Sequence, residues 1–271
     1  MAFRVLAFIF LALTGLAAQP ATAQSGPGGA LDAVPAGLAS RDHPVPQSTD
    51  FNLITAVDVS DSITRSDEFL QYSGLARGVV DPAFLGRIAE GTERRIGFTA
   101  FTWSSGGAVD VIVPWTVIET RADAERVAAQ FESAPRIDRS TYGRYRPLTS
   151  SVDRPGAGMT DIAEAIQSAV QMSLTAPYTA HRSVINILSN GVDNNGQDPS
   201  TIRDQAISMG ITINGIVFGD RDDLPDYFRQ RVIGGPGAFL MTINQPADLP
   251  SVLEKKFWQD MIAALTEPSA G

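Results

Sequence analysis

The chain has 271 residues, 44% of them hydrophobic, so it has enough apolar content to fold and is not disordered throughout. It contains no cysteine, which excludes disulfides, thiol nucleophiles and thiolate metal sites. Its formal net charge of −9 disfavours nucleic acid and anionic membrane surfaces as partners.

Residues 1–23 resemble a secretory signal peptide. Arg4 is followed by an apolar run over 5–18 and then by Ala21-Thr22-Ala23, a small-residue cleavage pattern. The apolar run is shorter than the roughly 20 residues that cross a bilayer. We therefore expect cleavage after Ala23, a periplasmic or secreted protein, and no integral membrane span in the mature form.

The rest of the chain divides by composition into three parts. Residues 24–50 are rich in Gly, Pro, Ala and Ser and predict a flexible linker. Residues 51–266 show a continuous pattern without internal repeats and predict one domain, and 267–271 form a tail.

Apolar runs and amphipathic runs alternate along this domain. The runs typical of strands cover 51–57, 95–102, 109–113, 183–188, 211–218 and 238–243. The runs typical of helices cover 66–80, 82–89, 122–133, 161–174, 200–209, 224–232 and 247–264. The alternation predicts an α/β fold with a doubly wound, mainly parallel six-stranded sheet and helices on both faces. The link at 104–107 is too short for a crossover, so 109–113 should be an antiparallel edge strand.

Three oxygen-bearing side chains directly follow the first predicted strand. Asp58, Ser60 and Ser62 occupy alternate positions, so their oxygens could converge on one hard cation. Mg²⁺ takes about six oxygen ligands at roughly 2.0–2.1 Å and usually keeps several waters. One carboxylate and two hydroxyls suit such an open site.

Two later segments could reach the same place. Thr160 ends a glycine-rich approach to a helix, and Asn190 and Asp193 follow the strand predicted at 183–188. Open α/β sheets bind ligands outside the carboxyl ends of their strands, where the strand order reverses. We therefore predict that the three segments meet there.

These segments, in this order, resemble the von Willebrand factor A (vWA) domain family and its metal-ion-dependent adhesion site. The first motif, Asp-x-Ser-x-Ser, matches at Asp58, and the isolated threonine matches Thr160. The usual Asp-Gly pair is replaced by Asn190-Gly191, which leaves Asp193 as a substitute carboxylate. Val-Pro-Trp at 113–115 and the run over 233–239 also resemble an uncharacterised bacterial branch of exported vWA-like proteins.

The resemblance implies a non-enzymatic binding domain. Ser60, Ser62 and Thr160 would touch Mg²⁺ (or Mn²⁺ or Ca²⁺), while Asp58 and either Asn190 or Asp193 would hold its waters. A cation with few carboxylate ligands seeks an acidic oxygen from a protein or peptide partner. The resemblance also implies that the last helix, 247–264, moves when the site is occupied.

Two other functions remain open. Asp58 beside Mg²⁺ also fits a phosphatase-like hydrolase, although the second Asp that such enzymes usually need is Ser60 here. The other alternative is a scaffold with a vestigial metal site. The only histidines, His43 and His181, do not follow strands, and no Gly-x-Ser-x-Gly elbow occurs.

Arginines and tryptophans give two further expectations. Arg136, Arg139, Arg144, Arg146 and Arg154 form a basic segment that either attracts acidic partners or is a solvated loop. Trp103, Trp115 and Trp258 should supply core area.

Overall fold

Buried apolar runs form the central sheet, as the sequence predicts. The computed structural model describes residues 47–136 and 158–265. A six-stranded sheet has the order β4-β3-β2-β6-β7-β8, and every residue of β2, β3 and β7 is buried. Its strands are β2 (Asn52–Asp58), β3 (Ile96–Trp103), β4 (Val109–Ile118), β6 (Ser183–Ser189), β7 (Ile211–Phe218) and β8 (Leu240–Ile243). The predicted α/β fold is confirmed.

The antiparallel pairing of β4 with β3 is confirmed, but β4 is longer than predicted. The predicted run ended at residue 113, directly before Pro114, which has no backbone N–H to donate to a neighbouring strand. The structure accommodates Pro114 because β4 is an edge strand and its register with β3 shifts near Ala100. The last strand, β8, is shorter than the predicted run over 238–243.

The helices α1 to α5 begin at residues whose side chains cap free backbone N–H groups, whereas the Asp223 side chain makes no such hydrogen bond at the start of α6. Thr64 and Thr120 each form a capping box, and Asp81 and Asp198 cap helices that begin with proline. The helices are α1 (Arg65–Val79), α2 (Pro82–Glu90), α3 (Arg121–Ser133), α4 (Ile162–Leu174), α5 (Pro199–Ser208), α6 (Leu224–Arg231) and α7 (Leu249–Leu265), with a 3-10 turn at Pro246–Asp248.

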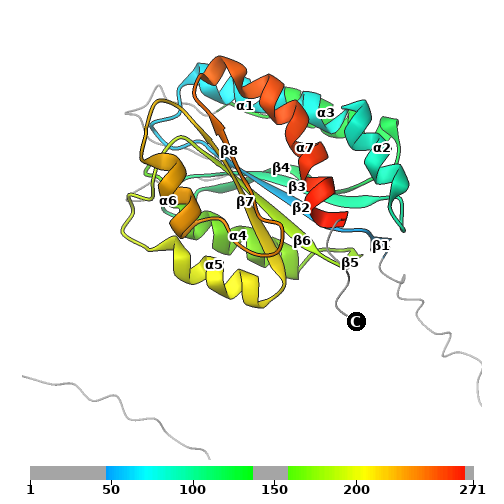
Figure 1. Cartoon of the computed structure of the whole chain (residues 1–271). Coiled ribbons are helices and arrows are strands. Elements are labelled where there is room, and N and C mark those ends of the chain that lie inside the picture. Colours follow the sequence, from blue (N-terminus) through cyan, green and yellow to red (C-terminus); the bar gives the residue numbers. More distant parts are fainter. Residues whose placement is uncertain (1–46, 137–157, 266–271) are drawn as a thin grey trace, which may run out of the picture. The chain divides into compact units, whose positions relative to one another are not determined.

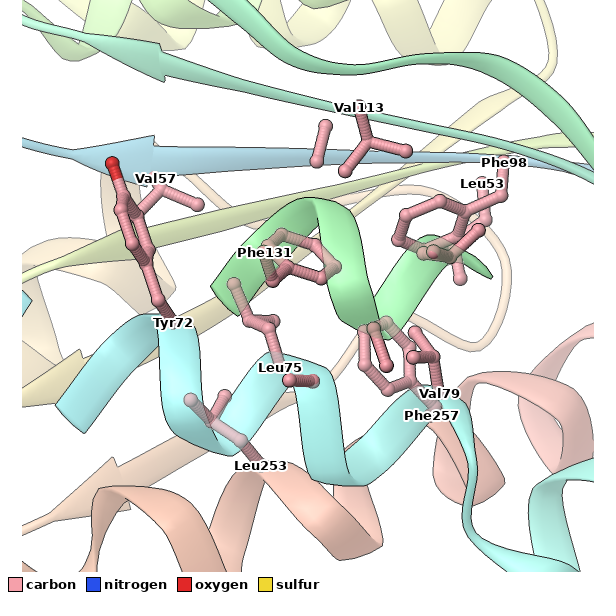
Figure 2. Close-up of a cluster of buried hydrophobic side chains, with 14 of the residues drawn as sticks. Leu53, Val57, Tyr72, Leu75, Val79, Phe98, Val113, Phe131, Leu253 and Phe257 are labelled. Carbon is pink, nitrogen blue, oxygen red and sulfur yellow. The ribbon is translucent and has the colours of Figure 1, made fainter. Parts of the chain in front are cut away.

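Helices cover both faces of the sheet (Figure 1). α1, α2, α3 and α7 bury one apolar cluster against it, and α4, α5 and α6 bury another. Figure 2 shows the first cluster, in which Leu53 and Val57 of β2 meet Tyr72 and Leu75 of α1 and Phe257 of α7. Strand alternation decides which residues face each cluster: Leu53 and Val57 face the first, while Ile54 and Ala56 face the second.

Two glycines let α1 and α7 approach closely. A Cβ added at Gly74 would lie 2.9 Å from the Cα of Pro250, and one added at Gly78 would lie 2.7 Å from the carbonyl oxygen of Leu253. Neither position has room for a larger side chain. The two helices therefore pack backbone against backbone, although most of the domain separates them in sequence.

A short parallel pair lies outside the main sheet. β1 (Ser48–Thr49) pairs with β5 (Thr179–Ala180), and Thr49 is fully buried. Composition assigns residues 48–50 to the linker, but the structure includes them in the folded unit, because Ser48 and Thr49 pair with β5 and the backbone N–H of Asp50 donates to the carbonyl of Arg95 at 2.9 Å. The predicted signal peptide, the linker up to residue 46 and the tail from 267 lie outside the described residues.

The described part of the chain contains no helix that is long and apolar enough to span a bilayer. Trp103 is fully buried in the second cluster, and Trp115 packs against that cluster's edge, so the core expectation holds for both. The side chain of Trp258 lies outside the described residues.

Candidate functional site

The three predicted segments meet where the strand order reverses. The chain leaves β2 to pair β3 on one side and later returns to pair β6 on the other, so the carboxyl ends of β2 and β6 flank the switch point. Asp58 ends β2, and Ser189 ends β6 with Asn190 directly after it. The topology therefore places the first and third segments side by side.

Asp58 anchors the site from inside and is fully buried. One carboxylate oxygen, Oδ1, accepts a hydrogen bond of 2.8 Å from the backbone N–H of Ser60, and Oδ2 accepts one of 2.6 Å from the Ser189 hydroxyl. Burial raises the pKa of Asp58 above its usual 3.8, and these hydrogen bonds only partly offset that effect. Both carboxylate oxygens are thus engaged with donors of the protein.

A chain of hydroxyls lies next to this carboxylate. The Oγ atoms of Ser60 and Ser62 are 3.2 Å apart, and the Thr160 hydroxyl donates to Ser60 Oγ, also at 3.2 Å. Ser60 and Thr160 are buried and Ser62 is exposed, so the chain of hydroxyls runs from the interior to the surface.

Asn190 joins this chain at its exposed end. Its Oδ1 accepts a 2.7 Å hydrogen bond from the Ser62 hydroxyl, and its Nδ2 donates to the Ser62 carbonyl at 3.2 Å. The structure therefore brings together five of the six predicted residues: Asp58, Ser60, Ser62, Thr160 and Asn190.

The sixth predicted residue, Asp193, binds the start of α4 instead. Its Oδ2 accepts hydrogen bonds from the backbone N–H groups of Ile162 and Ala163, at 2.8 and 3.3 Å, and its Oδ1 accepts one from Asn195 N at 3.1 Å. A carboxylate at this position also complements the helix dipole. Burial raises the pKa of Asp193. Of the two candidates left open for the third segment, Asn190 is the one whose side chain meets Ser62.

The neighbouring loops hold Thr160 in place, and these contacts were not predicted. Thr160 N donates to Asn194 Oδ1 at 2.8 Å, and Asn194 N donates to the Thr160 carbonyl at 2.9 Å. On the other side, Asp61 N donates to the carbonyl of Gly158 at 2.7 Å. Gly158 has a φ of 97°, a conformation that favours glycine.

Sequence reasoning also missed Ser189. Its position was available from the sequence, because it is the first polar residue after the apolar run of β6 and lies beside Asp58 once the two strands pair. A serine at a strand end is common, so composition alone did not distinguish it.

The donor set fits a hard divalent cation. Ligands on adjacent vertices of an octahedron around Mg²⁺ are separated by about 3 Å, given Mg–O distances of roughly 2.0–2.1 Å. The two hydroxyl separations of 3.2 Å are close to that value. The set differs from a carboxylate cage: within 47–136 and 158–265, no group of three or more His, Asp or Glu side chains could hold a metal.

The basic segment is only partly described. The guanidinium of Arg136 lies over the Tyr72 ring, 4.2 Å from its centroid, on the α1 side of the molecule. Arg139, Arg144, Arg146 and Arg154 lie outside the described residues.

Solved structures with the same fold come from adhesion and matrix proteins. Proximal thread matrix protein 1 from the mussel byssus, with a zinc-occupied MIDAS motif, aligns with a TM-score of 0.54 and 14% identity over 80% of this chain and 49% of that chain. The pilus adhesin SpaC from Lactobacillus rhamnosus GG aligns with a TM-score of 0.51 and 12% identity over 80% of this chain and 31% of that chain. This chain thus spans half or less of each neighbour. The neighbours are vWA-domain proteins, so the fold is that of a vWA-like domain.

A family model described as "Protein of unknown function (DUF1194)" matches residues 48–144 and 147–264. The chain belongs to this family. None of the curated proteins compared with it matches its sequence.

Proposed function

We propose that this protein is an exported, non-enzymatic binding domain that recognises an acidic group of a protein or peptide partner through a divalent cation. The observation that carries the proposal is that three hydroxyls from two separate loops converge: the hydroxyl oxygens of Ser62 and Thr160 each lie 3.2 Å from that of Ser60. Mg²⁺ is the cation that this oxygen set suits best, and Mn²⁺ and Ca²⁺ are the alternatives.

Each residue has a distinct role in this proposal. Ser60, Ser62 and Thr160 would hold the cation, and Asp58 and Asn190 would hold the waters around it. When bound, the cation supplies a Lewis-acidic position for a carboxylate oxygen from outside. Asp58 is the only carboxylate among the five, so little negative charge of the protein competes with the partner's carboxylate for the cation.

The geometry of Asp58 favours binding over phosphoryl transfer. A nucleophilic carboxylate needs an oxygen free to attack, whereas both oxygens of Asp58 accept hydrogen bonds and the side chain is fully buried. The exposed end of the site is formed by Ser62 and Asn190, and within 47–136 and 158–265 the Ser62 hydroxyl contacts Ser60 and Asn190 rather than a base. Turnover of a phosphate ester that Asp58→Asn abolishes would nevertheless establish the hydrolase alternative.

Calorimetric titration of Mg²⁺ and Mn²⁺ into the full chain tests the cation site. We expect a heat of binding in the wild type and in Thr201→Ala, whose hydroxyl lies on the exposed surface of α5, and none in Ser60→Ala or Thr160→Ala. Equal heats in all four proteins would refute the assignment of these residues. No heat in any of them would favour the scaffold with a vestigial site.

Paired peptides test the partner chemistry. Peptides of one sequence that carry either Asp or Asn at the central position should differ in binding, and only the Asp peptide should lose affinity when the cation is chelated. The same affinity for both peptides would contradict recognition through a carboxylate.

A further inference from the structure

A second polar cluster lies away from the candidate site, between α7 and the sheet. It consists of Lys256 and Asp260 of α7, Asn186 of β6 and Asn214 of β7, and all four residues are fully buried. Asn186 and Asn214 are register partners on neighbouring strands. Side chains of a strand point alternately to the two faces of the sheet, and the apolar residues of β6 and β7 two positions away from these asparagines belong to the apolar cluster that α7 covers. The two asparagines therefore face α7. We call this set the α7 polar cluster.

Within it, an amine, a carboxamide and a carboxyl group contact one another. Lys256 Nζ donates to Asn186 Oδ1 and to Asp260 Oδ1, both at 2.6 Å. Asn186 Nδ2 donates to Asp260 Oδ2 at 2.9 Å, which closes the triangle. Asn214 Nδ2 donates to Asp260 Oδ1 at 3.0 Å, so this oxygen accepts hydrogen bonds from both Lys256 and Asn214.

Water is kept away from the amine. The Phe239 ring centroid lies 4.9 Å from Lys256 Nζ, and the four polar residues have no exposed surface. Burial lowers the pKa of Lys256 and raises that of Asp260, and the attraction between the two charges offsets this only in part. Moving one proton from the amine to the carboxyl group removes both buried charges. The products are a nucleophilic amine and a protonated acid.

We propose that Lys256 and Asn186 condense into an isopeptide bond, with Asp260 as the proton carrier. The lone pair of the neutral Nζ attacks Cγ of Asn186, and the Nζ–Cγ bond forms. Asp260 accepts a proton from Nζ and gives one to Nδ2, the Cγ–Nδ2 bond breaks, and ammonia leaves. An amine and a primary amide thus become a secondary amide and ammonia, so the reaction needs no oxidant or other reactant.

The contacts select Asn186 over its neighbours as the acceptor. Lys256 Nζ lies 2.6 Å from its carbonyl oxygen, within reach of the carbonyl group, and Asn214 Nδ2 donates to the same oxygen at 3.4 Å, which polarises the carbonyl toward attack by Nζ. The side-chain oxygen of Asn214, Oδ1, instead accepts a hydrogen bond from the backbone N–H of Phe239. The fold holds the Lys256 amine and the Asn186 carboxamide together permanently, and this proximity raises the rate of an otherwise slow amide exchange without an external enzyme.

The bond would link two residues 70 positions apart and fix α7 to β6 in a chain that has no cysteine for a disulfide. It would also oppose the movement of the last helix that the family resemblance implies. The cation site takes no part in the reaction, so this inference and the proposed function succeed or fail separately.

Tryptic peptide mapping of the denatured full chain tests the bond. Trypsin cleaves after Arg182, Arg203 and Lys255 but not after an acylated Lys256, so we expect a branched peptide that joins 183–203 to 256–271 and is lighter by one ammonia than the two alone. Fragmentation should place the link at Asn186. Intact mass is not sufficient, because Gln24, the N-terminal residue after cleavage at Ala23, also loses ammonia when it cyclises.

A pair of matched lysine variants provides the control. Lys255 is exposed and precedes Lys256 on the same helix, so Lys255→Arg should keep the branched peptide while Lys256→Arg loses it completely. Asp260→Asn should also abolish it.

Complete cleavage of the wild type after Lys256 would overturn the proposal, whether or not the variants fold. Loss of water instead of ammonia would overturn it as well, because the bond would then join Lys256 to Asp260. A branched peptide that persists in Asp260→Asn would refute the role of Asp260.

Discussion

Replacing Ser189 by Ala removes the hydroxyl that donates a hydrogen bond to Asp58 Oδ2. The bond is 2.6 Å long and its acceptor is fully buried, so the carboxylate would lose this hydrogen bond in a place that water does not reach, although the contacts from Ser60 and from the backbone N–H of Asn190 would remain. A hydrogen bond to a charged group contributes about 1.5–3 kcal/mol. In a domain of this size we expect the melting temperature to fall by about 3–12 °C.

The sign of the pH dependence follows from Asp58. Its pKa is raised by burial, so the folded state holds the proton more tightly than the unfolded state, and stability falls as the pH rises from 3.8 through the folded pKa. Loss of the Ser189 donor raises that pKa further. The difference in the free energy of unfolding between the wild type and the variant should therefore be largest above the raised pKa of Asp58. The loss should shrink to that of a neutral hydrogen bond, about 0.5–1.5 kcal/mol, once the carboxyl group is protonated.

Urea unfolding at about pH 8 and about pH 4 measures both effects. Ser183→Ala is the matched control, because Ser183 lies at the other end of β6, where its hydroxyl accepts a 2.7 Å hydrogen bond from Ser173. Its loss should be small and independent of pH over this range. If Ser189→Ala unfolds at the same urea concentration as the wild type at both pH values, the Ser189 hydroxyl does not stabilise the buried Asp58 carboxylate.

Three other substitutions give separate expectations. Gly78→Ala should lower the free energy of unfolding by about 1–3 kcal/mol in a urea titration, because the added Cβ would meet the α7 backbone. Gly86→Ala is the control: nothing lies within 4 Å of its added Cβ, so the free energy of unfolding should rise by up to about 1 kcal/mol. Asn190→Asp should strengthen Mg²⁺ binding about tenfold in calorimetry, since it adds a carboxylate to a site that has only one, and unchanged affinity would place residue 190 outside the site. Asp193→Asn should destabilise the start of α4 by about 1 kcal/mol in thermal unfolding and leave a heat of Mg²⁺ binding, and loss of that heat without loss of stability would make residue 193 a ligand.

Periodicity was sufficient to predict the sheet, because buried parallel strands are continuously apolar and their order along the chain constrains the topology. It placed β4 correctly at the edge but ended the strand too early, because an edge strand with a register shift can continue through Pro114. It also failed at residues 48–50, since a two-residue strand carries no period.

For the site, spacing found the loop after β2 because three oxygens alternate there. Asp193 and Ser189 show the limit of that method. A carboxylate three residues past Asn190 satisfies the chemistry of a ligand, but the loop turns it toward the N-terminus of α4. Lys256 and Asp260 likewise have the spacing of a solvent-exposed pair on a helix, and only the packing of α7 against β6 and β7 shows that they are buried.

The glycine contacts between α1 and α7 constrain how the chain acquires its structure. α1 lies near the start of the domain and α7 at its end, so the α1 surface beside Gly74 and Gly78 has no cover until the last residues have been synthesised. Contacts between segments so distant in sequence form late, after the intervening loop has closed. A nascent or truncated chain that lacks 249–265 would expose this apolar face, and its release from the ribosome in that form would favour aggregation over folding.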